Sequence, residues 1–135
     1  MTNQTDKLRV LVADDSTMVR AGVIDMINQI PDVEVIGYAE DGVQAIAMVE
    51  KLRPDVAILD IRMPEKNGIQ ALEEIKRSHP QIIVIMLTNF PYLPYRKKCM
   101  SAGADYFLEK SMEFGAVIQV LTDLGQKRFH PAENT

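Results

Sequence analysis

The sequence predicts an α/β protein whose core is a doubly wound, five-stranded parallel sheet. Short apolar segments rich in β-branched residues alternate five times with segments of helical period. Several of these apolar segments lack polar alternation, which is typical of strands buried on both faces. Crossovers in such sheets are right-handed. One common strand order is 2-1-3-4-5, which places the ligand site at the carboxyl ends of strands 1 and 3.

The strands are predicted from runs of apolar and β-branched residues. They cover residues 8–13 (LRVLVA), 33–39 (VEVIGYA), 55–59 (DVAIL), 82–87 (IIVIML) and 106–108 (YFL). Four helices are predicted from apolar stripes: Val19, Val23, Ile27 and Ile30; Ile46, Val49 and Leu52; Ile69, Leu72 and Ile75; and Phe114, Val117, Ile118, Leu121 and Leu124. Pro31, Pro54 and Pro80 each follow a helical segment, where a helix is expected to stop.

The fourth helix is the least regular, because residues 89–95 (NFPYLPY) contain two prolines. We expect a long loop there, with the helix running from near Pro94 to Gly103. The final helix is expected to give way to a polar tail after Gly125. The prediction is therefore one domain over residues 1–135, with a core at about 8–125 and a tail at 126–135.

Composition narrows the class of protein. The chain has 135 residues, which suits one domain, and a net charge of −4, which argues against direct nucleic-acid binding. No apolar run approaches the roughly 18 residues of a membrane span, and the polar N-terminus shows no signal peptide. The single cysteine, Cys99, cannot form an internal disulfide. These features fit a cytoplasmic protein without a membrane partner.

Charged and hydroxyl residues gather at the ends of the predicted strands. Asp14 and Asp15 follow the first strand, Asp60 the third and Thr88 the fourth, and Lys110 lies near the end of the fifth. Because these ends share one edge of a parallel sheet, three carboxylates are expected to crowd together. Mg²⁺ would relieve their repulsion and could orient a phosphoryl group toward Asp60 as nucleophile. Lys110 could pair with phosphate and the Thr88 hydroxyl could donate to it.

Each residue alone has a plainer interpretation. Asp14 and Asp15 could start a helix, and Asp60 could be a turn residue. Thr88 could be a cap, and Lys110 a solvated charge. The functional interpretation rests on their falling together at one sheet edge.

Four motifs carry a family resemblance: V-A-D-D-S (12–16), D-I-R-M-P-E-K-N-G (60–68), L-T-N (87–89) and G-A-D-Y-F-L-E-K (103–110). They resemble the response regulator receiver family, which has a flavodoxin-like fold, and the likeness covers residues 9–124. It implies that Asp60 is the phosphoacceptor. Asp15, Asp60 and the Arg62 carbonyl would bind Mg²⁺ directly, with Asp14 acting through water. Thr88, Asn89 and Lys110 would contact phosphate, and Thr88 and Phe107 would form the switch.

The chain departs from the family pattern in the loops after strands 4 and 5. The family usually has Lys-Pro with a cis bond where this chain has Lys110-Ser111, and we expect a trans bond here. The position of Asn89 usually holds a smaller residue. We also hypothesise that Phe90 and Arg62 flank the path of the hydrolytic water and slow loss of the phosphoryl group.

The resemblance implies a partner on each side of the switch. A sensor histidine kinase or a phosphotransfer protein would donate the phosphoryl group. The output would be a separate protein or a second copy, bound through the fourth helix, fifth strand and fifth helix of a stand-alone receiver. Tyr95, Lys97, Lys98 and Phe107 are the candidate partner surface; a solvated helix face is the alternative. No enzymatic activity beyond self-phosphorylation and dephosphorylation is expected. The rival interpretations are an unphosphorylated adaptor, a metal-dependent phosphatase or hydrolase, and a flavin-binding domain of similar fold, in which two carboxylates would repel the flavin phosphate.

Overall fold

The computed structural model describes residues 7–89, 92–110 and 114–129, in which strands and helices alternate along the chain. The strands are β1 (Leu8–Ala13), β2 (Val33–Ala39), β3 (Val56–Leu59), β4 (Ile83–Thr88) and β5 (Tyr106–Glu109). The helices are α1 (Thr17–Ile27), α2 (Gly42–Leu52), α3 (Gly68–Ser78), α4 (Leu93–Ser101) and α5 (Phe114–Phe129).

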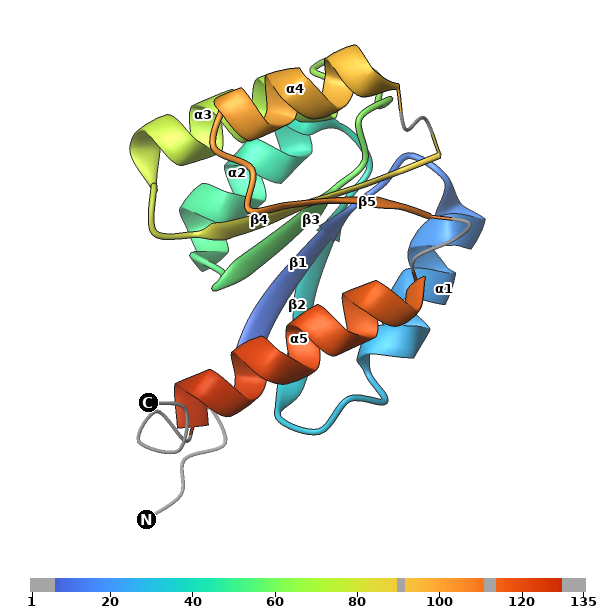
Figure 1. The fold of residues 1–135 in the computed structure, drawn as a ribbon, viewed down its shortest axis with the longest axis vertical. Coiled ribbons are helices and arrows are strands. Elements are labelled where there is room, and N and C mark those ends of the chain that lie inside the picture. The colour runs from blue at the N-terminus through green and yellow to red at the C-terminus, as the bar shows by residue number, and fades with distance from the viewer. Residues whose placement is uncertain (1–6, 90–91, 111–113, 130–135) are drawn as a thin grey trace.

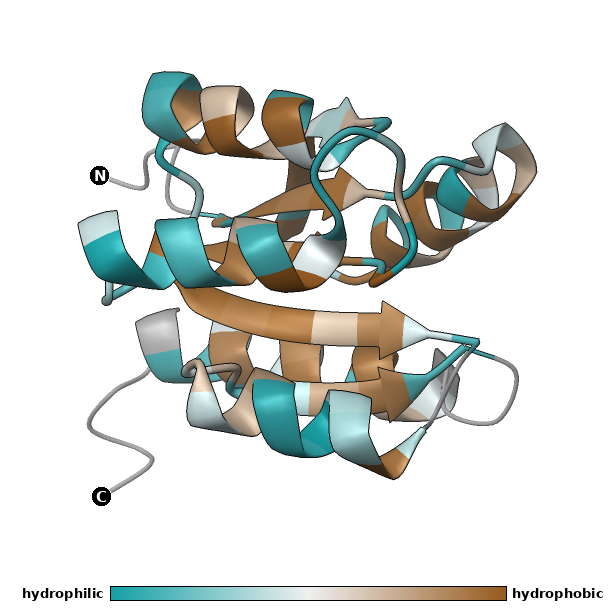
Figure 2. Ribbon diagram, turned by 90° about the horizontal axis from the view of Figure 1, so that it is seen from above, coloured by the Kyte–Doolittle hydropathy of each residue, from teal (hydrophilic) through white to brown (hydrophobic). Residues whose placement is uncertain are grey.

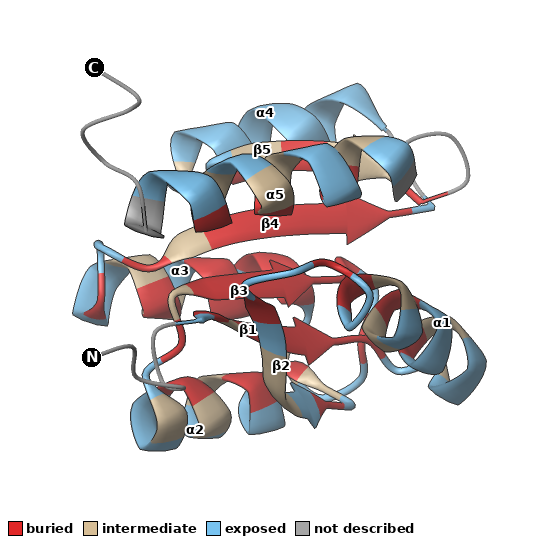
Figure 3. Cartoon of the chain, turned by 90° about the horizontal axis from the view of Figure 1, so that it is seen from below, coloured by how far each residue is buried: buried red, intermediate tan, exposed pale blue. Residues whose placement is uncertain are grey.

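The five strands form one parallel sheet in the order β2-β1-β3-β4-β5, which confirms the predicted fold class and strand order. Figure 1 shows α2, α3 and α4 on one face of the sheet and α1 and α5 on the other. The two faces bury separate apolar clusters, one packed with α2–α4 and the other with α1 and α5. The central strands β1, β3 and β4 are accordingly the most apolar and most deeply buried elements (Figures 2 and 3).

The register of the central strands brings their carboxyl ends to one edge. Ala13 of β1 pairs with Leu59 of β3, and the Asp60 N–H donates to the Ala13 carbonyl over 3.0 Å. All four residues of β3 are buried. The polar residues that follow β1 and β3 therefore leave the sheet next to each other, at the edge where the sequence places the site.

Local sequence signals start the helices on either side of this edge. The Ser16 hydroxyl caps α1 by accepting from the Val19 N–H over 3.2 Å. Asn67 and Gln70 form a reciprocal capping box at the start of α3, with both hydrogen bonds at 2.9 Å. The ends of both loops that precede these helices are thus fixed by hydrogen bonds.

Several boundaries match the predictions, others differ slightly, and the end of the last helix differs most. β1 and β2 end where expected, β4 extends one residue further to include Thr88, and α4 begins at Leu93. The expectation that the last helix ends near Gly125 is wrong, because α5 continues to Phe129. Gly125 packs against the start of β2: a Cβ added there would lie 3.5 Å from Val33 Cγ2. Pro91 lies outside the described residues.

Within the described residues, no helix has the length and apolar character that crossing a membrane requires.

Candidate functional site

The site lies at the carboxyl edge of the sheet, where four strands end. Asp14 follows β1, Asp60 follows β3, Thr88 is the last residue of β4 and Lys110 follows β5. The Lys110 N–H donates to the Thr88 carbonyl over 2.8 Å, so these two residues are joined through the backbone. The sheet itself therefore fixes the relative positions of the polar residues predicted from the sequence.

Three carboxylates form an acidic cluster, defined as Asp14, Asp15 and Asp60. One oxygen of each lies within 4.8 Å of the others. Asp14 and Asp60 are buried, whereas Asp15 is exposed. The buried ammonium of Lys110 lies 2.5 Å from Asp14 Oδ2 and 3.2 Å from Asp60 Oδ2. The structure thus brings together four of the predicted site residues, with Lys110 as counterion to two of them.

The buried Asp60 carboxylate is in an energetically unfavourable environment. Among the described residues, no donor reaches its buried Oδ1. Burial raises the pKa of the Asp60 carboxyl; Lys110 opposes this shift, while Asp14 and Asp15 add to it. A buried carboxylate oxygen without a partner is costly, so this atom is suited to a ligand that supplies positive charge.

The donor set fits a hard divalent cation. Three carboxylates close together offer the oxygen ligands that Mg²⁺ prefers, and an exposed residue, Asp15, leaves the cluster accessible from solvent. The unpartnered Asp60 Oδ1 supplies an acceptor that no described protein group uses. The chemistry that such an arrangement supports is the neutralisation and orientation of an anionic substrate next to a carboxylate nucleophile.

The loop after Asp60 is packed so closely that two positions require glycine. A Cβ added at Gly68 would lie 1.9 Å from the Asp60 carbonyl oxygen, and one added at Gly42 would lie 2.0 Å from the Lys66 carbonyl oxygen. The two glycine N–H groups donate over 2.8 Å, Gly68 to Ile61 and Gly42 to Lys66. The starts of α2 and α3 therefore clamp the loop and hold Asp60 in place.

The expected switch residue lies inward. The Phe107 ring is buried in the cluster beneath α4. The Arg96 guanidinium lies 5.5 Å from the ring centroid, and its Nη1 donates to the Phe107 carbonyl over 3.3 Å. Tyr95 is partly buried against the same cluster and meets Tyr92 edge-on, whereas Lys97 and Lys98 are exposed. Arg96 of α4 thus contacts both the ring and the carbonyl of Phe107 on β5.

Other predicted residues remain at the stage of prediction. Arg62 and Asn89 are exposed in the loops that follow β3 and β4, and their parts in metal and phosphate binding are still expectations. Phe90, the hydrolysis hypothesis that includes it, and Ser111 lie outside the described residues.

One residue of the site region was missed by the sequence reasoning. Arg20 is buried and donates to the Asp14 carbonyl from Nη1 over 2.8 Å. The signal was available, because Arg20, Val23 and Ile27 share one helix face at steps of three and four. A cation in the register of an apolar stripe indicates a buried partner.

Comparison with known proteins agrees with this geometry. A family model described as the response regulator receiver domain matches residues 10–122. The protein-glutamate methylesterase/protein-glutamine glutaminase of Pyrococcus horikoshii is 42% identical over 111 residues, which are 82% of this chain. The chain spans only 27% of the length of that relative.

Two solved structures share the architecture. The response regulator domain of Thermotoga maritima CheB is 34% identical with a TM-score of 0.78, and the match covers 90% of this chain and 96% of that chain. A chain of the CheX-CheY-BeF3-Mg²⁺ complex from Borrelia burgdorferi is 26% identical with a TM-score of 0.80, covering 87% and 88%. The fold, the acidic edge of the sheet and the family match together show that the chain belongs to the response regulator receiver family of two-component systems.

Proposed function

We propose that the protein is a phosphorylation-dependent signalling switch in which Asp60 accepts the phosphoryl group. The observation that carries this proposal is the acidic cluster, in which Asp14 and Asp60 are buried, Lys110 contacts both, and Asp60 Oδ1 has no partner among the described residues. An oxygen of Asp60 would attack phosphorus as the bond to the donor breaks. The donor, a histidine of a sensor kinase or phosphotransfer protein, would leave with the electron pair and take up a proton from solvent.

Mg²⁺ is the proposed cofactor. Asp14, Asp15 and Asp60 would hold it, together with the Arg62 carbonyl. When bound, the ion neutralises charge on the transferring group, which three carboxylates would otherwise repel. The likeness to a chain crystallised in a complex with BeF3 and Mg²⁺ supports this part of the proposal.

The remaining site residues would act on the phosphoryl oxygens. Lys110 already lies between Asp14 and Asp60, so its ammonium can move from carboxylate to phosphate over a short distance. The Thr88 side chain lies at the same edge, where its hydroxyl could donate a hydrogen bond, and Asn89 follows it as a further donor.

The output surface would be the face of α4, β5 and α5. Helix α4 contains Arg96, Lys97 and Lys98 and no acidic residue, although the whole chain carries a net charge of −4. This local positive charge favours an acidic protein partner, whether a separate output protein or a second copy, and the net negative charge of the chain argues against nucleic acid. Tyr95 and Phe107 would transmit the change, because Phe107 packs beneath α4 on the strand that leads to Lys110. We propose no enzymatic turnover beyond the reactions of Asp60 itself.

The test is covalent labelling. The protein is incubated with Mg²⁺ and acetyl phosphate, and intact mass spectrometry should show one added phosphoryl group that chelation of Mg²⁺ abolishes. Asp60→Asn is the matched control and should remain unlabelled. Labelling that persists in this variant would remove Asp60 from its role, lack of any labelling would favour an adaptor, and sustained hydrolysis of phosphoesters would favour a phosphatase.

A further inference from the structure

We propose that Arg20 is a positioning residue for the cation site, because it fixes the peptide that joins Asp14 to Asp15. This inference rests on the proposed function, since it concerns the binding of Mg²⁺ by the acidic cluster. Arg20 itself would touch neither the ion nor the phosphoryl group.

The burial of Arg20 needs an explanation from its contacts. Its side chain is 8% exposed, on the face of α1 that packs against the sheet. Removing a guanidinium from water is costly unless hydrogen bonds and opposite charge compensate. A residue placed there only to fill space would be apolar, like its neighbours Val23 and Ile27 on the same face.

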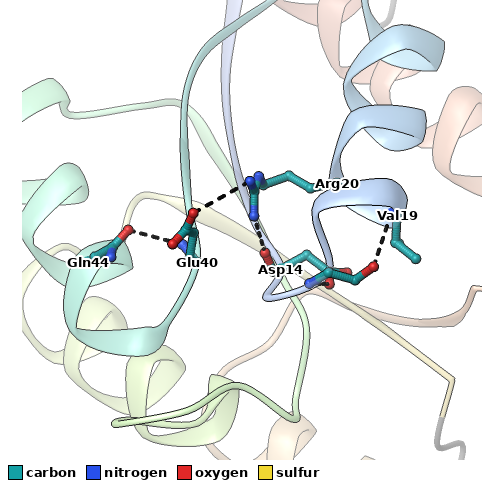
Figure 4. A network of polar contacts seen from close by, with 6 residues as sticks. Asp14, Val19, Arg20, Glu40 and Gln44 are labelled. Carbon is teal, nitrogen blue, oxygen red and sulfur yellow. Dashed lines mark hydrogen bonds and ion pairs between the residues drawn. The ribbon is translucent and has the colours of Figure 1, made fainter.

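The guanidinium joins three separate segments (Figure 4). Nη1 donates to the Asp14 carbonyl over 2.8 Å, and Nη2 lies 3.7 Å from Glu40 Oε1. The same group lies 4.8 Å from the centroid of the Tyr38 ring on the edge strand β2. Glu40 is in turn held at the start of α2, because its N–H donates to Gln44 Oε1 over 3.1 Å. Arg20 therefore ties the end of β1 to β2 and α2.

The contact with Asp14 acts on Asp15 through the backbone. The Asp14 carbonyl and the Asp15 N–H belong to one planar peptide unit, so fixing the carbonyl direction fixes the rotation of that unit. Asp14 is already held at its other end, where its N–H donates to the Ala39 carbonyl over 3.0 Å. Asp15 is exposed, and the direction of its side chain depends on this peptide. Arg20 thus helps to set where the exposed ligand of the acidic cluster points.

The positive charge of Arg20 and its proposed positioning role predict opposite changes in Mg²⁺ affinity when Arg20 is replaced, so the test separates the two effects. A guanidinium near the acidic cluster repels a cation, so electrostatics alone predicts that removing it tightens Mg²⁺ binding. Loss of positioning predicts the opposite. Residues that orient metal ligands typically change metal affinity by about 10- to 100-fold when they are substituted.

The experiment is a titration with Mg²⁺, monitored by backbone amide chemical shifts in the full chain at a temperature where each variant is fully folded. Arg20→Met should weaken binding about tenfold. Arg20→Lys, which keeps a donor and the charge, should stay within about threefold of the wild type. Glu40→Gln should have a smaller effect than Arg20→Met, since Glu40 is half exposed and its contact is long. Arg77→Met, on the exposed face of α3, controls for the change in net charge.

Equal or tighter Mg²⁺ binding by Arg20→Met would overturn the inference, as would an equal loss in Arg77→Met. Absence of Mg²⁺ binding by the wild type would instead overturn the metal step of the proposed function, so the two failures are distinguishable. Should Arg20→Met fail to fold, Arg20→Gln takes its place with the same expectation. A purely structural role would lower stability without changing the affinity of the folded protein for Mg²⁺.

Discussion

Replacing Asp60 with asparagine should stabilise the metal-free protein at pH 7, although it removes the proposed acceptor. The sign follows from the pKa, which burial raises above the ordinary value of 3.8. An acid with a raised pKa binds its proton more tightly in the folded state. Its ionisation therefore begins to cost stability as pH rises through 3.8, and the cost is complete above the folded pKa. Asparagine avoids that cost at every pH.

The magnitude can be worked from the distances around Asp60. With an effective dielectric constant of about 20, Lys110 at 3.2 Å attracts the carboxylate by about 5 kcal/mol. Asp14, within 4.8 Å, repels the Asp60 carboxylate by about 3.5 kcal/mol or more. Asp15, at a similar distance, repels it less because water screens its charge. These terms nearly cancel. The burial of the charged Oδ1 without a donor, at a cost of about 1–3 kcal/mol that is smaller for the neutral amide of asparagine, then decides the sign.

We expect Asp60→Asn to raise the free energy of unfolding by about 1 kcal/mol, with the loss of the Lys110 contact included. This gain corresponds to a Tm about 4 °C higher. The assay is thermal denaturation followed by circular dichroism, with and without Mg²⁺, from pH 4 to pH 8. Asp25→Asn, an exposed acid on α1, is the control for net charge. Mg²⁺ should raise the Tm of the wild type and not that of Asp60→Asn. A metal-free Asp60→Asn protein that melts at or below the wild type at pH 7 would refute the reasoning.

Three further predictions concern the surroundings of Asp60 and the link to α4. Gly68→Ala should lower the free energy of unfolding by more than about 2 kcal/mol in urea denaturation, because its Cβ would collide with the Asp60 carbonyl 1.9 Å away. Lys110→Met should tighten Mg²⁺ binding, measured by the same amide titration, because the ammonium competes with the ion for Asp60; weaker binding would contradict this. Arg96→Met should cost about 0.5–1 kcal/mol of stability and should shift the Phe107 amide resonance, since both the ring contact and the carbonyl hydrogen bond are lost; an unchanged Phe107 resonance would count against that link.

The sequence was sufficient for the sheet and for its polar edge. Strand β3 is apolar without interruption and β1 is interrupted only by Arg9, and such segments, separated by helical ones, predict a buried parallel sheet. Because parallel strands end at one edge, the residues after them had to meet. Asp14, Asp60 and Lys110 do lie together, with Lys110 between the two acids.

The features that could not be predicted depend on packing between distant segments. Gly125 matches the usual signal for a helix end, but that signal requires a left-handed backbone, and here the glycine lies within α5, next to Val33 at the start of β2. Phe107 lies inward in the apolar cluster beneath α4, and its contact with Arg96, eleven residues earlier in the chain, is not visible in any local pattern. Arg20 could have been noticed, but its partners lie just after β1 and at the end of β2, and no local pattern identifies them.

We expect the two cations near the acidic cluster, Lys110 and Arg20, to have opposite effects on its affinity for Mg²⁺. Lys110 contacts the carboxylate oxygens directly, so it stabilises the metal-free cluster and competes with an incoming ion. Arg20 contacts only a backbone carbonyl of the cluster, so it can orient the ligands without occupying their oxygens. Substituting the two residues should therefore change Mg²⁺ affinity in opposite directions, tighter for Lys110→Met and weaker for Arg20→Met, although each change removes one positive charge. Tighter binding in both variants would show that net charge alone, and not the placement of each cation, governs the site.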